Sequence, residues 1–338
     1  MLSLRQGTVI EVQPSRSDGE IDEIVVDVDG VARPAFADVS MVGATEVGDS
    51  VVVNIEAVDL NLGSGGRDVV LVNLTRGLTG EPDPNRHVMK LNYTALQTGV
   101  APVESTKLDV PIAAPAAIFQ LHGQLAPVAW AAANANPGLK LGYVQTGGGA
   151  LPGKYSSTVK QLRERGLLCD HLTAAPAYGG DGEAMSTIGA LHSGLRDRGW
   201  DAAVVGPGPG IIGSGTPLGH GGMNALDSTH CALALGCSAV LVARASSGDP
   251  RERHRGVSHH TRTVLELLLA QVTVAFSDGS TIPDEAARHD ARVVEVEIEE
   301  YAASGLPSRT MGRDWTEDRQ FFECAMAGGV ALADLLRD

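Results

Sequence analysis

Residues 201–222 read DAAVVGPGPGIIGSGTPLGHGG, and this stretch decides how the rest of the chain is interpreted. The apolar run 202–205 predicts a buried strand, and a helical pattern begins at Met223. Glycines in the loop between them let backbone N–H groups approach a ligand, because no Cβ stands in the way. Ligands of open α/β sheets bind at the carboxyl ends of strands. We therefore expect loop 206–222 to form the floor of a ligand site.

On both sides of this stretch, strand and helix patterns alternate from about residue 110 onward. This alternation predicts βαβ units in a mainly parallel, doubly wound sheet, a three-layer α/β/α domain over residues 110–338. The last strand should lie at an edge, because its glutamates need solvent. The expected strands are 115–121, 139–146, 167–175, 202–205, 238–243, 272–276 and 291–299, and the expected helices are 125–135, 156–165, 183–198, 223–235, 261–270 and 314–336.

Residues 1–78 have a different pattern. Five short β-rich runs are separated by turn signals, and Asp29-Gly30 between two alternating runs indicates a hairpin. Such spacing predicts a small β-barrel of the SH3 or OB kind. Acidic residues dominate this region, which favours a structural or docking barrel over a nucleic-acid-binding one. Residues 79–109, with a polar, proline-bearing start, are expected to be a linker and crossover segment.

Composition limits the classes of partner. The chain has 338 residues and a formal net charge of −15, which argues against nucleic-acid binding because phosphate contacts need basic surface. No signal peptide is visible, and no apolar run is long enough to cross a membrane. Four cysteines without a CxxC pair are typical of free thiols in a reducing compartment. We expect a cytoplasmic protein without nucleic-acid or membrane partners; both a monomer and a homo-oligomer stay open.

Four glycine-rich loops follow predicted strands, and in a parallel sheet all four lie at the same carboxyl edge. Tight turns and close helix packing are the alternative explanation for many of these glycines. The loop at 206–222 lacks the Lys-Ser/Thr pair of a phosphate-binding P-loop, and its proline-interrupted glycine spacing argues against a dinucleotide site. The candidate ligand-binding residues at this edge are His122, Gly147, Gly148, Gly206, Gly208, Gly210, Gly213, Ser214, Gly215 and Thr216.

Residues 244–261, RASSGDPRERHRGVSHHT, concentrate positive charge and histidine after another predicted strand. Ser258 is a good N-cap and places His259 and His260 in the first helical turn, where the helix dipole disfavours a charged imidazole. Neutral histidines there can act as general bases or as hydrogen-bond donors. A solvated basic loop is the alternative. His254, His259 and His260 together could bind a metal, but their spacing matches no standard zinc pattern, so no metal residue is assigned and metal use by this cluster stays open.

Further candidates come from both loops. His220 stands between two glycines and has little packing reason to be there, although a single histidine is more often structural. We therefore treat three residues as catalytic candidates: His220, His259 and His260. To the ligand-binding candidates we add Arg253, His254, Ser258 and Arg313, of which Arg313 precedes the last helix and is equally compatible with an ordinary surface charge.

Three stretches together support a family resemblance: RHVMKLNYT at 86–94, GPGPGIIGSGT at 206–216 and RHRGVSHHT at 253–261. With them, the chain resembles an uncharacterised bacterial family, a domain-of-unknown-function family, over nearly its whole length, barrel included. The resemblance implies a cytoplasmic bacterial protein. It brings no activity, substrate or catalytic residue.

These observations lead to one functional hypothesis and two alternatives. The hypothesis is an enzyme of hydrolase or transferase type, acting on an anionic or phosphorylated small molecule at the carboxyl edge of the sheet. The first alternative is a non-catalytic small-molecule-binding or regulatory protein whose barrel engages a partner. The second is a scaffold with a vestigial site. No cofactor is identified, and whether the loops at 206–222 and 249–262 meet decides whether the composite site exists.

Overall fold

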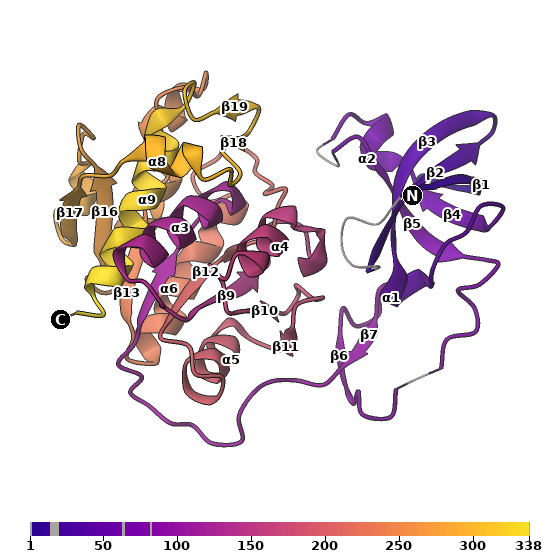
Figure 1. Cartoon of the computed structure of the whole chain (residues 1–338), viewed down its shortest axis with the longest axis horizontal. Coiled ribbons are helices and arrows are strands. Elements are labelled where there is room, and N and C mark those ends of the chain that lie inside the picture. Colours follow the sequence, from indigo (N-terminus) through magenta and orange to yellow (C-terminus); the bar gives the residue numbers. More distant parts are fainter. Residues whose placement is uncertain (1, 14–19, 63–64, 82, 338) are drawn as a thin grey trace. The chain divides into compact units, whose positions relative to one another are not determined.

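The computed structural model of this chain describes residues 2–13, 20–62, 65–81 and 83–337, shown in Figure 1. The described chain divides into two compact units, one up to Ala101 and one from Pro102 onward. The predicted combination of an N-terminal β-barrel and a parallel α/β/α domain is confirmed. Among the described residues, every helix is too short or too polar to cross a bilayer.

The first unit is a closed five-stranded barrel with the strand order β1-β2-β3-β5-β4. Asp29 and Gly30 both have positive φ and join β2 to β3, which confirms the predicted hairpin. Valine, isoleucine and alanine side chains from alternating positions fill the barrel. The elements of this unit are β1 (Leu4–Gln13), β2 (Ile21–Val28), β3 (Val31–Asp38), α1 (Val39–Val42), β4 (Ser50–Asn54), α2 (Glu56–Asp59), β5 (Asp68–Asn73), β6 (Val88–Lys90) and β7 (Thr98–Val100).

The second unit is built on an eight-stranded sheet with the order β11-β10-β9-β12-β8-β13-β16-β17. All neighbouring strands in this sheet run parallel. The central strands are buried on both faces and are therefore almost entirely apolar. The strands are β8 (Pro115–Ile118), β9 (Leu141–Thr146), β10 (Asp170–Ala174), β11 (Gly182–Ala184), β12 (Ala202–Pro207), β13 (Ser238–Val242), β16 (Thr273–Ser277) and β17 (Asp290–Val294).

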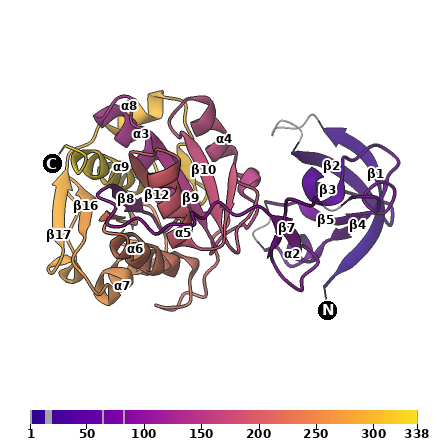
Figure 2. The same ribbon diagram turned by 90° about the horizontal axis from the view of Figure 1, so that it is seen from below.

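Helices cover both faces of this sheet, as Figure 2 shows. One apolar cluster joins the sheet to α5, α6 and α7, and the other joins it to α3, α4, α8 and α9. Neighbouring strand residues belong to opposite clusters: Ala116 and Ile118 to the first, Ala117 and Phe119 to the second. The helices are α3 (Leu125–Ala135), α4 (Ser157–Glu164), α5 (Thr187–His192), α6 (Asn224–Ala234), α7 (His259–Leu267), α8 (Ile298–Ala303) and α9 (Arg319–Asp334).

Several element bounds differ from the sequence-based expectation. The expected helix 183–198 begins only at Thr187, because Gly182–Ala184 pairs with β10 as the edge strand β11. The expected strand 291–299 ends at Val294, and α8 follows. A short hairpin of β18 (Arg309–Thr310) and β19 (Arg313–Asp314) precedes α9, which starts at Arg319.

The strand order places one switch point at the centre of the sheet. The chain leaves β8 toward β9 on one side, whereas after β12 it crosses back over β8 to β13. At such a point the loops after adjacent strands diverge and leave a crevice at the carboxyl edge. The loops after β8, β12 and β13 therefore surround the same crevice.

Candidate functional site

A cavity of about 350 Å³ lies where these three loops come together. It is lined on one side by residues of the loop after β12 and on the other by residues of the loop after β13. The two loops that the sequence analysis singled out therefore meet. The lining consists of Leu121, Ile211, Ile212, Gly213, Gly215, Arg244, Arg251, Arg253, His254, His260 and Met311.

Arg244 is the most unusual residue of this lining. It follows β13 directly and is only 3% exposed. Its guanidinium donates to Nδ1 of His260 at 2.6 Å and lies 3.8 Å from the sulfur of Met311. Among the described residues, no carboxylate forms an ion pair with it. Burial lowers the pKa of Arg244 to about 10, so it stays charged at neutral pH. A buried, unpaired charge costs several kcal/mol, which an incoming anion can offset.

The neighbouring buried charges are paired instead. Asp249, fully buried, accepts from Arg251 at 2.8 Å and from Arg313 at 3.2 Å. Asp318, also fully buried, accepts from Arg313 and from Ser246. The hydrogen bond that Asp249 accepts from Arg251 is the main reason that the pKa of Asp249 lies well below its ordinary value. These pairs hold the loop after β13 in place and neutralise Arg313, which does not line the cavity.

Among the described residues that line this cavity, Arg253 is the second cation without a carboxylate partner. Its side chain is exposed and reaches over Gly215, where an added Cβ would come within 3.3 Å of the guanidinium. Gly215 has a positive φ of 82°, so a side chain there would be strained as well as crowded. Two unpaired guanidiniums, one buried and one exposed, therefore face the same space.

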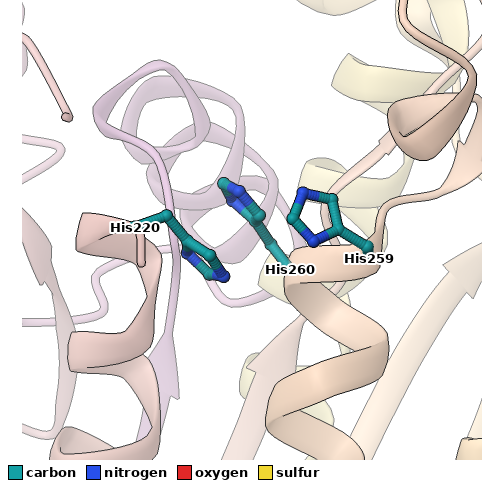
Figure 3. Close-up of side chains that lie close together, drawn as sticks. All are labelled: His220, His259 and His260. Atoms are coloured by element: carbon teal, nitrogen blue, oxygen red, sulfur yellow. The ribbon is translucent and has the colours of Figure 1, made fainter. Parts of the chain in front are cut away.

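Four histidines gather beside Arg244. His220 and His260 lie face to face, with ring centroids 3.4 Å apart and planes 5° from parallel, and His259 packs edge-on against His260 (Figure 3). His254 lies 5.1 Å from the ring of His260. Gly222 leaves room for this stack, since a Cβ there would lie 3.0 Å from Nδ1 of His220.

The cluster is electrically neutral at physiological pH. Burial lowers the pKa of His220 to about 4 and that of His254 to about 3. Burial together with the charge of Arg244 also lowers the pKa values of His259 and His260. Neutral imidazoles retain a lone pair, so they can accept a proton or bind a metal ion.

Their hydrogen bonding separates these histidines into two kinds. Nδ1 of His254 lies 2.8 Å from Oγ of Ser258, and Ser258 also caps α7 by accepting from the backbone N–H of His260. In contrast, both ring nitrogens of His220 and Nε2 of His259 are buried without a hydrogen-bond partner among the described residues. The Pro217 carbonyl favours the charged form of His220 but lies outside hydrogen-bonding geometry. Buried polar atoms without a partner in the protein are rare, and an ordered water, an ion or a ligand can satisfy them.

The residues predicted to be catalytic occupy different places. His260 lines the cavity, whereas His220 and His259 lie behind it. Reciprocal backbone bonds fold the loop after β12 on itself and place Gly213 opposite His220. One ring nitrogen from each of His220, His259 and His260 lies within 4.8 Å of the others. The sequence left open a metal at His254, His259 and His260, whereas the triplet that the fold brings together contains His220 from the other loop in place of His254.

A second cavity of about 400 Å³ shares Leu121, Ile211 and Met311 with the first, so the two adjoin. Its other lining residues are less charged: His122, Gly123, Ala126, Thr158, Pro209, Gly210, Pro307, Arg309 and Thr310. Here His122 is fully partnered, with Nδ1 3.2 Å from the Pro207 carbonyl and Nε2 2.7 Å from Oγ of Ser156. Burial lowers the pKa of His122 to about 4.

The remaining candidates for ligand binding lie outside both cavities. Gly206 and Gly208 are buried packing positions: a Cβ would approach the Phe119 ring to 2.3 Å or the Ala150 carbonyl to 2.5 Å. Gly147 and Gly148 pack near the start of α6 in the same way. Ser214 and Thr216 are exposed and bond to each other at 2.9 Å. Only Gly210, Gly213 and Gly215 of the predicted glycines line a cavity.

Sequence reasoning missed the polar residues that build the cavity walls. Gln124 accepts from two backbone N–H groups and donates to the Ala243 carbonyl, which ties the end of β8 to the end of β13. Thr261 donates to Gln120 at 2.8 Å. Arg244 itself had a signal in the sequence, because a charged residue directly after an apolar strand is placed at the buried end of that strand.

No curated protein matches the chain. A crystal structure of 2-haloacrylate reductase matches with 13% sequence identity, over 99% of this chain and 79% of that one, at a TM-score of 0.19, which is too low to support any argument. A sequence family described as "Protein of unknown function (DUF3866)" matches residues 35–329, so the chain belongs to that family.

Proposed function

We propose that the α/β unit binds an anionic small molecule, of the phosphorylated class, in the cavity lined by Arg244 and Arg253. The observation that carries this proposal is the buried guanidinium of Arg244, which has a neutral histidine and a thioether as its neighbours. A phosphate or carboxylate oxygen supplies the charge-assisted hydrogen bonds that this group lacks. The site at a topological switch point supports the same proposal.

The adjoining cavity suggests the rest of the ligand. Its lining is largely apolar and backbone, with the two side chains His122 and Arg309 at its edge. A ligand with an anionic end near Arg244 and a less polar body beside Leu121 and Ile211 matches the two chambers. Phosphate monoesters of nucleosides or other organic alcohols have this form.

The reaction proposed for this site is hydrolysis or group transfer. His254 lines the anion cavity as a neutral imidazole and can exchange protons with a bound ligand. His260 also lines the cavity, and its lone pair accepts from Arg244. A bound anion compensates the positive charge of Arg244. The pKa values of the neighbouring histidines then rise toward the working range of a general base. Binding without turnover is the alternative, and it separates a sensor from an enzyme.

Binding of inorganic phosphate and of a panel of phosphate monoesters, measured by thermal shift and calorimetry, tests the proposal. We expect Arg244→Met to weaken phosphate binding by about 10- to 100-fold, since a hydrogen bond to a charged group contributes roughly 1.5–3 kcal/mol. Arg262→Met is the matched control, because Arg262 lies on α7 and pairs with Glu285 at the surface. Equal phosphate affinity in the wild type and Arg244→Met would refute the proposal. Turnover of a bound monoester that is lost in His254→Gln and His260→Gln would identify an enzyme.

A further inference from the structure

We infer that His220, His259 and His260 form a binding site for a divalent transition-metal ion of the zinc type, and that metal and anion strengthen each other's binding through Arg244. Three nitrogens within 4.8 Å of one another supply the ligands. The site adjoins the anion cavity, because His260 belongs to both. The metal part rests on the histidine geometry alone, and the coupling part rests on the proposed function.

The orphaned nitrogens are the first argument. His220 is 6% exposed, yet neither of its ring nitrogens has a hydrogen-bond partner among the described residues. The same holds for Nε2 of His259. A metal ion satisfies one nitrogen on each ring with a bond stronger than the missing hydrogen bond.

The chemistry of the donor set is the second argument. Imidazole nitrogens suit Zn²⁺ and neighbouring transition metals, whereas Mg²⁺ and Ca²⁺ need oxygen ligands. Tetrahedral zinc with Zn–N bonds of about 2.0–2.1 Å requires nitrogens roughly 3.3 Å apart. The rings of His220 and His260 lie in nearly parallel planes, so at least one ring must rotate out of the stack before both in-plane lone pairs can reach the same ion. Three histidines leave the fourth position open for water or an anion oxygen, as in catalytic zinc sites.

Arg244 provides the coupling. A neutral imidazole has one nitrogen lone pair in the ring plane, and Arg244 uses that of His260 by donating to Nδ1 at 2.6 Å. The metal needs the same lone pair, whichever nitrogen coordinates it. Metal binding therefore releases the guanidinium of Arg244 from His260 and leaves it free for an anion. Reciprocity of linked equilibria then requires the anion to favour the metal by the same factor.

Titration of the metal-free full-length chain with Zn²⁺, in competition with a chromophoric chelator, tests the metal site. We expect one equivalent per chain and visible absorption of a four-coordinate complex when Co²⁺ replaces Zn²⁺. His220→Gln and His259→Gln should each weaken Zn²⁺ binding at least 10-fold. His87→Gln, an exposed histidine in the first unit, is the matched control and should leave it unchanged. Zn²⁺ affinity that is equal in His220→Gln, His259→Gln and the wild type would overturn the inference, as would the absence of a bound equivalent.

Two further titrations test the coupling and separate it from the proposed function. Arg244→Met should bind Zn²⁺ about 10-fold more tightly than the wild type without anion, because the competing donor and its charge are gone. Inorganic phosphate should tighten Zn²⁺ binding in the wild type and should do so at least several-fold less in Arg244→Met, where only the open metal position can hold the anion. Zn²⁺ binding without any phosphate binding leaves the metal site standing and removes the anion proposal. Phosphate binding without Zn²⁺ binding removes the metal site and leaves the anion proposal standing.

Discussion

Two groups of buried histidines lie in the same α/β unit, and they differ in how their polar atoms are satisfied. His171 stacks on Tyr143 with ring centroids 4.9 Å apart and lies 3.2 Å from Oε1 of Gln145. His122 bonds through both nitrogens. In the other group His220 stacks more closely, with its ring centroid 3.4 Å from that of His260, but its ring nitrogens have no hydrogen-bond partner among the described residues.

This difference separates buried groups whose polar atoms are paired within the fold from buried groups whose polar atoms are not. In the His122–His171 group, none of the ring nitrogens in the described structure is both fully buried and without a partner, so these residues stabilise the unit. In the His220–His260 group, and in Arg244 beside it, compensation is incomplete. Unpaired buried groups of this kind are typical of functional sites, because a ligand can supply the hydrogen bonds or the opposite charge that the fold does not supply. Stability measurements on single variants can therefore distinguish the two groups without knowledge of the ligand.

The largest expected effect is on the free energy of unfolding of alanine variants. His171→Ala should lose about 3 kcal/mol or more, since it creates a cavity under Tyr143 and leaves Gln145 unsatisfied. His220→Ala should lose about 1 kcal/mol or less, because the relief of two desolvated nitrogens offsets the lost packing. Urea unfolding of both variants in metal-free buffer measures this difference. Equal losses would break the comparison.

The pH dependence of stability gives the next effect. Burial lowers the pKa of His171 to about 3, below the value of about 6.5 that it has in the unfolded chain. The unfolded state therefore binds the proton first, and the contribution of His171 is complete above pH 6.5 and declines as the pH falls toward 3. By pH 4.5 the loss should reach roughly 2–3 kcal/mol. His171→Gln should show a shallower decline than the wild type over this range, and parallel curves would contradict the assignment.

The fold and the location of the candidate site could be predicted from the sequence more readily than the pairing of individual buried groups. Periodicity and glycine signals are local, so the alternating elements and the hairpin at Asp29-Gly30 could be read directly. Whether a polar group is paired depends on residues far away in the chain. Asp249 neutralises Arg313, 64 residues later, whereas Arg244 in the same loop finds no carboxylate. The stacking of His220 on His260 likewise joins two separate loops.

The glycines of a single loop illustrate the same limit. Gly206 and Gly213 are seven positions apart and look alike in the sequence. The ring of Phe119, from the neighbouring strand, packs on Gly206 and leaves no room for a ligand. Gly213 lines the cavity instead. Only the packing of adjacent strands distinguishes a structural glycine from one that faces a ligand.

Replacement of Arg244 should change the free energy of unfolding in the opposite direction from the histidine replacements. Arg244→Met should stabilise the ligand-free chain by about 1–2 kcal/mol, because an unpaired buried charge gives way to an apolar side chain of similar length. Arg313→Met should destabilise it, since Asp249 and Asp318 lose a partner while they remain buried. Thermal unfolding of the two variants measures both signs. A destabilised Arg244→Met would place Arg244 among the structural groups.

The smallest expected effect concerns Met311, whose sulfur lies beside Arg244 at the rim of both cavities. Met311 has a positive φ of 48° in the turn between β18 and β19, a conformation that costs a residue with an ordinary side chain about 1 kcal/mol. Asparagine tolerates this conformation, so Met311→Asn should raise stability by up to about 1 kcal/mol. It should also weaken phosphate monoester binding, because the apolar wall that the cavities share becomes polar. A gain in stability with unchanged monoester affinity would mean that the strained turn serves the fold and not the ligand.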